Sequence, residues 1–249
     1  MLSPCTTIDQ VVDRLEAITR ESRQSKNPLG YFAALYLGVT RRVQQGLKQG
    51  EFSRPEQMEK LDVVFANRYF EALELFKQGK PCSKSWYETF RASTTQRLTV
   101  LQHLVMGMNA HIHFDLGLAA VETVRMNPLE TVREDFFTIN TILAGMIETV
   151  ELRMSKISPL IQLLLPLAGK ADEMLTRFSI TTARDLAWTF ASEVASAPKP
   201  GDRIGKQDEE VALISKRVGN PQGRLRWITR LLALTEWRGT DKNIAILEA

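Results

Sequence analysis

The residues best suited to chemistry lie in one short segment, HLVMGMNAHIHFD, at positions 103–115. It holds all three histidines of the chain, His103, His111 and His113, and it ends in Asp115. If the segment is one continuous α-helix, His111 and Asp115 share a face one turn apart, and His103 lies about 80° round the helix from them. Asn109 and His113 point towards a different face. The spacing therefore predicts an imidazole and a carboxylate side by side.

Two kinds of site could use this pair. Zinc binds imidazole nitrogen and carboxylate oxygen, so His103, His111, Asp115 and Asp62, the last from a neighbouring helix, could hold a divalent metal and leave one position open. Without a metal, Asp115 could orient His111 as a general base. Both versions predict His111 and Asp115 as catalytic residues acting on a small, apolar molecule. Asn109 and Arg184 are predicted to bind a polar group of that molecule.

Charged side chains also fall on helix faces that are otherwise apolar. Asp62 lies within the apolar stripe of the segment 58–76, Asp135 is aligned with Ile139, and Arg184 lies with Ala187. A buried charge must either find a partner or become neutral, because desolvating it is costly. A structural interpretation is therefore open as well. In that interpretation these groups and the histidines form a buried hydrogen-bonded network, with Arg184 as the counter-charge of an aspartate.

Motifs that the chain lacks narrow the enzyme classes. It contains no GxxxxGK[ST], no GxSxG and no HExxH pattern, which leaves nucleotide-cradling, α/β-hydrolase and zincin chemistry without support. The enzyme hypothesis is then a metal-dependent hydrolase or lyase, or an acid–base enzyme. The alternative from another class is a non-catalytic helical module that binds a ligand or another protein. A terpene-cyclase-like enzyme is a lesser alternative, because Asn140 and Glu148 match the ends of a magnesium triad but Ala144 replaces its hydroxyl residue.

Helices must position these residues, because apolar side chains recur at helical spacing and no alternating run indicates a sheet. We predict an all-α, single-domain bundle of roughly eight to ten helices. The segment 196–207, with its prolines and glycines, is predicted to be a linker or long loop between the bundle (1–195) and a C-terminal helical appendage (208–249) that packs on it. The main predicted helices cover 7–22, 29–48, 53–79, 85–92, 94–124, 129–155 and 180–195.

Composition describes an ordinary globular chain. Its 249 residues are 44% hydrophobic and 24% charged, which allows a large core and excludes intrinsic disorder. The net charge of +3, from 32 basic and 29 acidic side chains spread along the chain, predicts no nucleic-acid partner. Cys5 and Cys82 form no ligand motif, so we expect a reducing, cytoplasmic setting. The longest apolar stretch, 157–168, is too short to span a bilayer, and we expect no membrane span.

Five separated blocks, in order, resemble a known family. The chain is similar to the bacterial family catalogued as domain of unknown function five-nine-nine-five, which implies an all-helical protein and supplies no established activity, cofactor or partner. The surroundings of His111 are also similar, over a few residues, to the HxxxD helix of zinc-dependent phospholipase C and nuclease proteins, whose trailing histidine ligands have no counterpart here. The five blocks are GYFAALY (30–36), LDVVFANRYF (61–70), HLVMGMNAHIHFDLG (103–117), DFFTIN (135–140) and ARDLAW (183–188).

Overall fold

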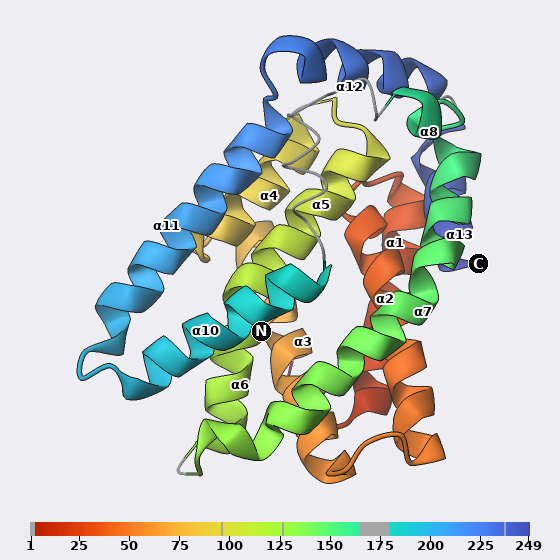
Figure 1. The fold of residues 1–249 in the computed structure, drawn as a ribbon. Helices are drawn as coiled ribbons and strands as arrows, with labels where there is room; N and C mark the ends of the chain where they lie inside the picture. The colour runs from red at the N-terminus through yellow and green to blue at the C-terminus, as the bar shows by residue number, and fades with distance from the viewer. Residues whose placement is uncertain (1–2, 96, 126, 165–179, 237) are drawn as a thin grey trace.

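The chain folds into a bundle of helices, shown in Figure 1. The computed structural model describes residues 3–95, 97–125, 127–164, 180–236 and 238–249, and these contain helices and no strand, so the all-α prediction is confirmed. The α-helices are α1 (Ile8–Ser25), α2 (Gly30–Gln49), α3 (Pro55–Lys77), α4 (Lys84–Thr95), α5 (Val100–Ala110), α6 (Gly117–Val124), α7 (Arg133–Ile157), α8 (Ile161–Leu164), α10 (Ile180–Ser196), α11 (Pro200–Gly219), α12 (Gly223–Thr235) and α13 (Thr240–Glu248). A π-helix, η1 (His111–Leu116), joins α5 to α6, and a 3₁₀-helix, η2 (Leu129–Val132), precedes α7.

Local sequence signals account for most helix ends. The Thr7 side chain accepts a hydrogen bond from the Gln10 backbone and caps α1, and Thr99 forms a capping box that opens α5. Pro55 stands in the first turn of α3, where its missing N–H has no cost. Gly50 ends α2 in the left-handed region, at a φ of 72°.

The prediction of a linker or long loop at 196–207 is wrong for most of that segment. Helix α10 continues to Ser196, and α11 begins at Pro200. Proline is favoured in the first turn of a helix, because its missing N–H has no partner there in any case. Pro200 therefore marks the start of α11 and does not indicate a linker. Helix α11 packs against α4 and α5, and α13 packs against α2. The C-terminal helices thus lie on the bundle.

The predicted helix 94–124 begins later and is not uniform. It starts at Val100, and a π-helix interrupts it from His111 to Leu116. A π-turn widens the helix by one residue per turn and changes the direction of the side chains beyond it. The interruption falls on the same residues that carry the HxxxD spacing.

The stretch Val100–Val124 is long and apolar enough to cross a membrane by length and composition alone, and it is the one such helix among the described residues. Within its most apolar window, 78% of the residues are buried inside the bundle. Helices at the core of a bundle have the same composition, because they are covered by protein on all sides. The end of the apolar stretch 157–168 lies outside the described residues.

Helix α7 bridges two parts of the core and leaves a space beneath its middle. Its first turns, including Phe136, pack with residues of α6 and α10. Its last turns, including Met154, pack with residues of α2 and α5. Between them, Ala144, Gly145 and Ile147 are exposed. Ala144 and Gly145 are small and bury little area, so the middle of α7 does not close the core.

Gly107 permits a close approach of two helices. A Cβ atom on Gly107 would lie 2.5 Å from the ring of Phe32 in α2, whereas a Cβ on Gly145 would meet no described atom within 4 Å. We predict that Gly107→Ala lowers the free energy of unfolding by about 1–3 kcal/mol through overpacking. Gly145→Ala is the matched control and should raise the free energy of unfolding by up to about 1 kcal/mol through helix propensity. Urea denaturation of both variants measures the difference, and equal stabilities would contradict this packing.

Candidate functional site

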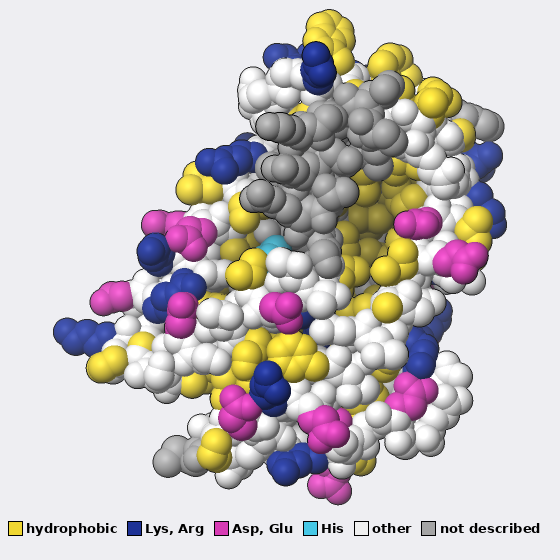
Figure 2. All heavy atoms as spheres, in the orientation of Figure 1, with side chains coloured by type: hydrophobic (Ala, Val, Ile, Leu, Met, Phe, Trp, Pro, Cys, Tyr) yellow, Lys and Arg dark blue, Asp and Glu magenta, His cyan; other side chains and the backbone are white. Residues whose placement is uncertain are grey.

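A cavity of about 500 Å³ lies between α2, α3, α5 with η1, α7 and α10. Its lining is mostly aliphatic and aromatic, and the side chains of Leu35, Leu104, Met108, Leu143 and Met146 are typical of it. Figure 2 shows an apolar hollow on the face of the molecule beside α7. Pockets for small molecules commonly have volumes of about 300–1,000 Å³, apolar walls and a few polar groups. We call this cavity the α7 pocket.

The polar groups of the α7 pocket are incompletely satisfied. Buried side-chain atoms without a hydrogen-bond partner among the described residues occur on five of its lining residues: Tyr36 Oη, Asp62 Oδ2, His111 Nδ1 and Nε2, Asn140 Oδ1 and Arg184 Nε. Most buried polar groups of folded proteins are hydrogen-bonded, so each exception requires a physical reason. Five such residues around one cavity indicate a surface shaped to receive polar groups from outside the chain.

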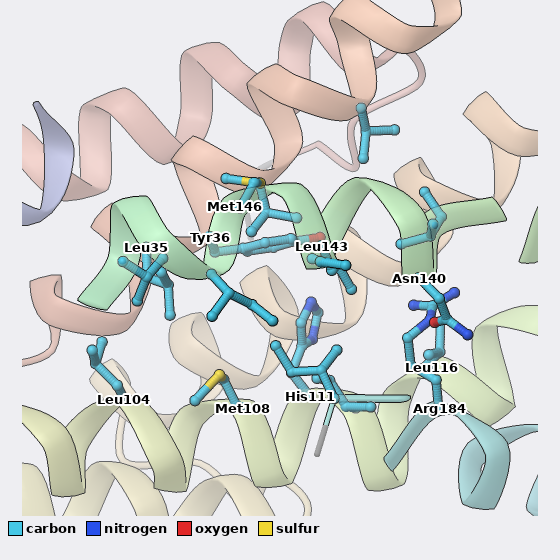
Figure 3. A pocket seen from close by; sticks show the side chains of 18 of the residues that line it. Leu35, Tyr36, Leu104, Met108, His111, Leu116, Asn140, Leu143, Met146 and Arg184 are labelled. Carbon is cyan, nitrogen blue, oxygen red and sulfur yellow. The ribbon is translucent and has the colours of Figure 1, made fainter. Parts of the chain in front are cut away.

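His111 stands in the middle of the α7 pocket, as Figure 3 shows. Its ring stacks on Phe65 with centroids 3.5 Å apart and an interplanar angle of 8°, and the Tyr36 ring meets it edge-on at 4.5 Å. Burial lowers the pKa of His111, and the neighbouring Asp115 opposes that shift. The surroundings of His111 therefore favour a neutral imidazole at neutral pH, with base character on one ring nitrogen.

Asp115 is held by other helices. Its carboxylate accepts a hydrogen bond from Arg68 Nε of α3 at 3.2 Å and another from Trp86 Nε1 of α4 at 2.6 Å. His111 Nδ1 lies 3.6 Å from Asp115 Oδ2, which is close enough for electrostatic attraction. Asp115 is buried and does not line the cavity. His111 and Asp115 thus lie side by side as predicted, with Asp115 behind His111 and only His111 facing the pocket, but no hydrogen bond joins them.

Arg184 and Asn140 belong to one end of the α7 pocket. Arg184 is only 4% exposed, donates through Nη2 to the backbone carbonyl of Phe136, and places its guanidinium 4.5 Å from the centroid of the Phe136 ring. Asn140 follows Phe136 by one turn of α7, so both lie on the same face of that helix. No aspartate among the described residues pairs with Arg184. The predicted ion pair of Arg184 with an aspartate is therefore not formed among these residues, and the exposed Asp185 acts on Arg184 only through electrostatic attraction.

Asp62 lies on the wall of the pocket contributed by α3. It is 6% exposed, and burial, with a smaller effect of Glu59, raises its pKa from 3.8 to about 7. Desolvation favours the protonated form, because no cation compensates the carboxylate. The prediction that Asp62 faces the core is thus confirmed, and its carboxyl group can hold or release a proton near neutral pH.

The four predicted metal ligands do not come together. His103 lies outside the pocket lining, with Nδ1 3.0 Å from Ser93 Oγ and its ring against Tyr31. Asp115 is engaged by Arg68 and Trp86 as described above. In the part of the chain that the structure describes, no group of three His, Cys, Asp or Glu side chains is placed to hold a metal ion. The expected coordination cluster is therefore not formed, because an ideal helical wheel overlooks the π-turn and the partners on neighbouring helices.

Two further predicted sites lie elsewhere in the bundle. Asn109 donates to the backbone of Val211 and to Ser215 of α11, so it connects α5 to α11 and does not face the pocket. Asp135 accepts hydrogen bonds from the backbone N–H groups of Ser53 and Arg54, and it thereby caps α3 from α7. Both are structural contacts of the kind that the network interpretation predicts.

Sequence reasoning missed several residues of the pocket. Tyr36 and Phe65, which enclose His111, read only as members of apolar stripes. The sequence indicates Asn140 only through its place in the incomplete magnesium triad. Asn140 and Ala144 of that triad line the pocket, whereas Glu148 is exposed and does not. A polar Asn140 directly after the buried Ile139 was the available signal.

The pKa of Asp62 generates a test of stability against pH. Asp62 ionises near 3.8 when unfolded and near 7 when folded, so the folded state retains a proton in this window and loses stability as the pH rises through it. We predict that Asp62→Asn matches the wild type at pH 4 and exceeds its free energy of unfolding by up to about 4 kcal/mol at pH 8. Urea denaturation across this range is the measurement. Glu148→Gln, at an exposed position of α7, controls for the loss of one negative charge. A stability difference between Asp62→Asn and the wild type that does not change with pH would refute the raised pKa of Asp62.

Comparison with known proteins supports the resemblance seen in the sequence. No curated protein and no solved structure matches the chain. A family model described as a family of unknown function (DUF5995) matches residues 8–221 and thus covers all helices from α1 to α11. The chain belongs to this family of unknown function.

Proposed function

We propose that this protein binds a small, largely apolar molecule in the α7 pocket. The observation that carries the proposal is the coincidence of an apolar cavity of about 500 Å³ with five lining residues whose buried polar atoms lack partners in the described chain. An apolar wall favours burial of an apolar molecule, and a few convergent polar groups fix its orientation. A purely structural network would instead satisfy its own polar groups, as Asp115 and Asn109 do.

A neutral fluorescent probe tests binding without assuming a natural ligand. We predict that 1-aminoanthracene binds the purified protein with enhanced fluorescence, and that Ala144→Phe reduces its affinity at least tenfold because the added ring occupies the pocket. Ala144 lines the pocket yet is exposed, so the substitution should leave the fold intact.

Ala195→Phe is the matched control, because Ala195 is exposed on α10 and does not line the pocket. Circular dichroism confirms that both variants are folded. Equal affinities of the two variants, or no binding by the wild type, would refute the proposed function.

Proton transfer on the bound molecule is a second candidate function, and one specific arrangement favours it. His111 Nδ1 lies 3.6 Å from Asp115 Oδ2, and neither Nδ1 nor Nε2 has a hydrogen-bond partner among the described residues. A proton on Nδ1 is stabilised by the carboxylate, so Nε2 becomes the basic nitrogen. Asp62, with a pKa of about 7, lines the same cavity and can supply or accept a second proton.

Nuclear magnetic resonance of the histidine rings tests this role. In ¹⁵N-labelled protein we expect His111 to be neutral at neutral pH with its proton on Nδ1, and we expect its ring signals to shift when 1-aminoanthracene binds. His103 is the internal control, since it lies outside the pocket and pairs with Ser93. His111 signals that stay unchanged while the probe is bound would remove the contact on which proton transfer depends.

The proposed function is compatible with the prediction from the sequence that this is a cytoplasmic bacterial protein with no nucleic-acid partner and no membrane span. That setting stays a prediction.

A further inference from the structure

Arg184 is a buried cation that forms no ion pair with a carboxylate of the described residues. The exposed Asp185 attracts it electrostatically, but this effect on its pKa is smaller than that of burial. The Arg184 side chain is almost fully buried, and burial lowers its pKa from 12.5 to about 9. The contacts that it does make, with the Phe136 carbonyl and the Phe136 ring, carry only partial negative charge. Buried charges in proteins are normally paired, because an unpaired one costs several kcal/mol of desolvation. The missing counter-charge therefore requires a source.

The position of Arg184 indicates where that counter-charge would lie. Arg184 lines the α7 pocket, and its Nε has no partner. Figure 3 shows its guanidinium at the same end of the pocket as the Asn140 side chain, with His111 towards the middle and Leu104 towards the opposite end. The unpartnered atom of Asn140 is the amide oxygen Oδ1, and a half-turn of the amide group would bring its NH₂ group to the same acceptor as Arg184. One end of the pocket thus presents hydrogen-bond donors, and the rest presents apolar walls.

We propose that the ligand of the α7 pocket is an apolar monocarboxylate, whose carboxylate pairs with Arg184 and Asn140 while its hydrocarbon part lies along Leu104, Met108 and Leu143. This inference rests on the proposed function and specifies its ligand. A planar guanidinium matches a carboxylate in charge and geometry. A single cation is a poor match for a doubly charged phosphate ester, which usually requires several donors and cations.

The far end of the pocket supports a single acidic group. Glu151 lines it there and is exposed, and it lies about 16 Å from Asn140 along α7 at a rise of 1.5 Å per residue. A second carboxylate on the ligand would meet this negative charge. Arg184 and Glu151 therefore lie at opposite ends of the pocket, and Asp62, with a pKa of about 7, is the second acidic residue of its lining.

Competition against 1-aminoanthracene tests the inference on the intact protein. Dodecanoate, dodecanol and dodecyl phosphate share one hydrocarbon chain and differ in the head group. At neutral pH we expect dodecanoate to displace the probe at a concentration at least tenfold lower than dodecanol or dodecyl phosphate. Dodecanol forms no charge-assisted hydrogen bond with Arg184, and the second negative charge of dodecyl phosphate would be left without a cation.

Arg184→Met tests the residue itself. We expect this substitution to weaken the binding of dodecanoate at least tenfold and to leave the affinity for dodecanol within about threefold of the wild-type value. Arg203→Met is the matched control, since Arg203 also lies over a phenylalanine ring, that of Phe190, and does not line the pocket. Arg184→Lys keeps the positive charge and should retain part of the preference for dodecanoate over dodecanol. This variant provides the test if Arg184→Met fails to fold.

The outcomes separate the two proposals. Equal affinity of the wild type for dodecanoate and dodecanol, with the probe bound, overturns the monocarboxylate and leaves apolar binding in place. Preference for dodecyl phosphate likewise overturns it in favour of a phosphate ligand. Failure of the wild type to bind the probe and all three amphiphiles overturns both proposals together.

Discussion

The carboxylate of Asp115 is the contact on which the geometry of the pocket depends. It accepts hydrogen bonds from Arg68 of α3 and Trp86 of α4, and it belongs to the π-helix that joins α5 to α6. A charged, fully buried acceptor with two donors from different helices resists displacement, since losing one donor leaves part of the charge unpaired. The π-turn is thereby fixed, and with it the direction in which His111 faces the pocket against Phe65.

The buried polar groups of the bundle then divide into two sets. One set is satisfied within the chain and holds helices together, as Asp135 does by capping α3 and Asn109 by joining α5 to α11. The other set lacks partners among the described residues. Its members on Tyr36, Asp62, His111, Asn140 and Arg184 lie around a single cavity under the middle of α7, and further members, such as Thr19 Oγ1 and Asn243 Oδ1, lie elsewhere in the bundle. The same physical cost of burial applies to both. For the unpartnered groups that line the cavity, no contact within the described chain offsets this cost, which points to a molecule from outside the chain.

Much of the fold could be predicted from local sequence, because helical periodicity and caps are local properties. Thr7, Gly50 and Pro55 mark helix ends in the expected way. The errors arose where distant contacts decide the outcome. Nothing near Asp135 indicates that it caps α3, and the hydrogen bonds to Asp115 come from helices that are distant in sequence. The polar outlier Asp62 could be predicted from its helix face, whereas the π-turn at His111–Leu116 could not be predicted by assuming a uniform helix.

The central claim is that the space beneath α7 is a true apolar binding cavity, and a crystal structure determined under xenon pressure tests it most directly. Xenon enters apolar cavities without needing any specific polar contact. The account predicts xenon density between α5 and α7, beside Leu104 and Met108. A structure in which side chains fill this space, with no xenon there, would contradict it.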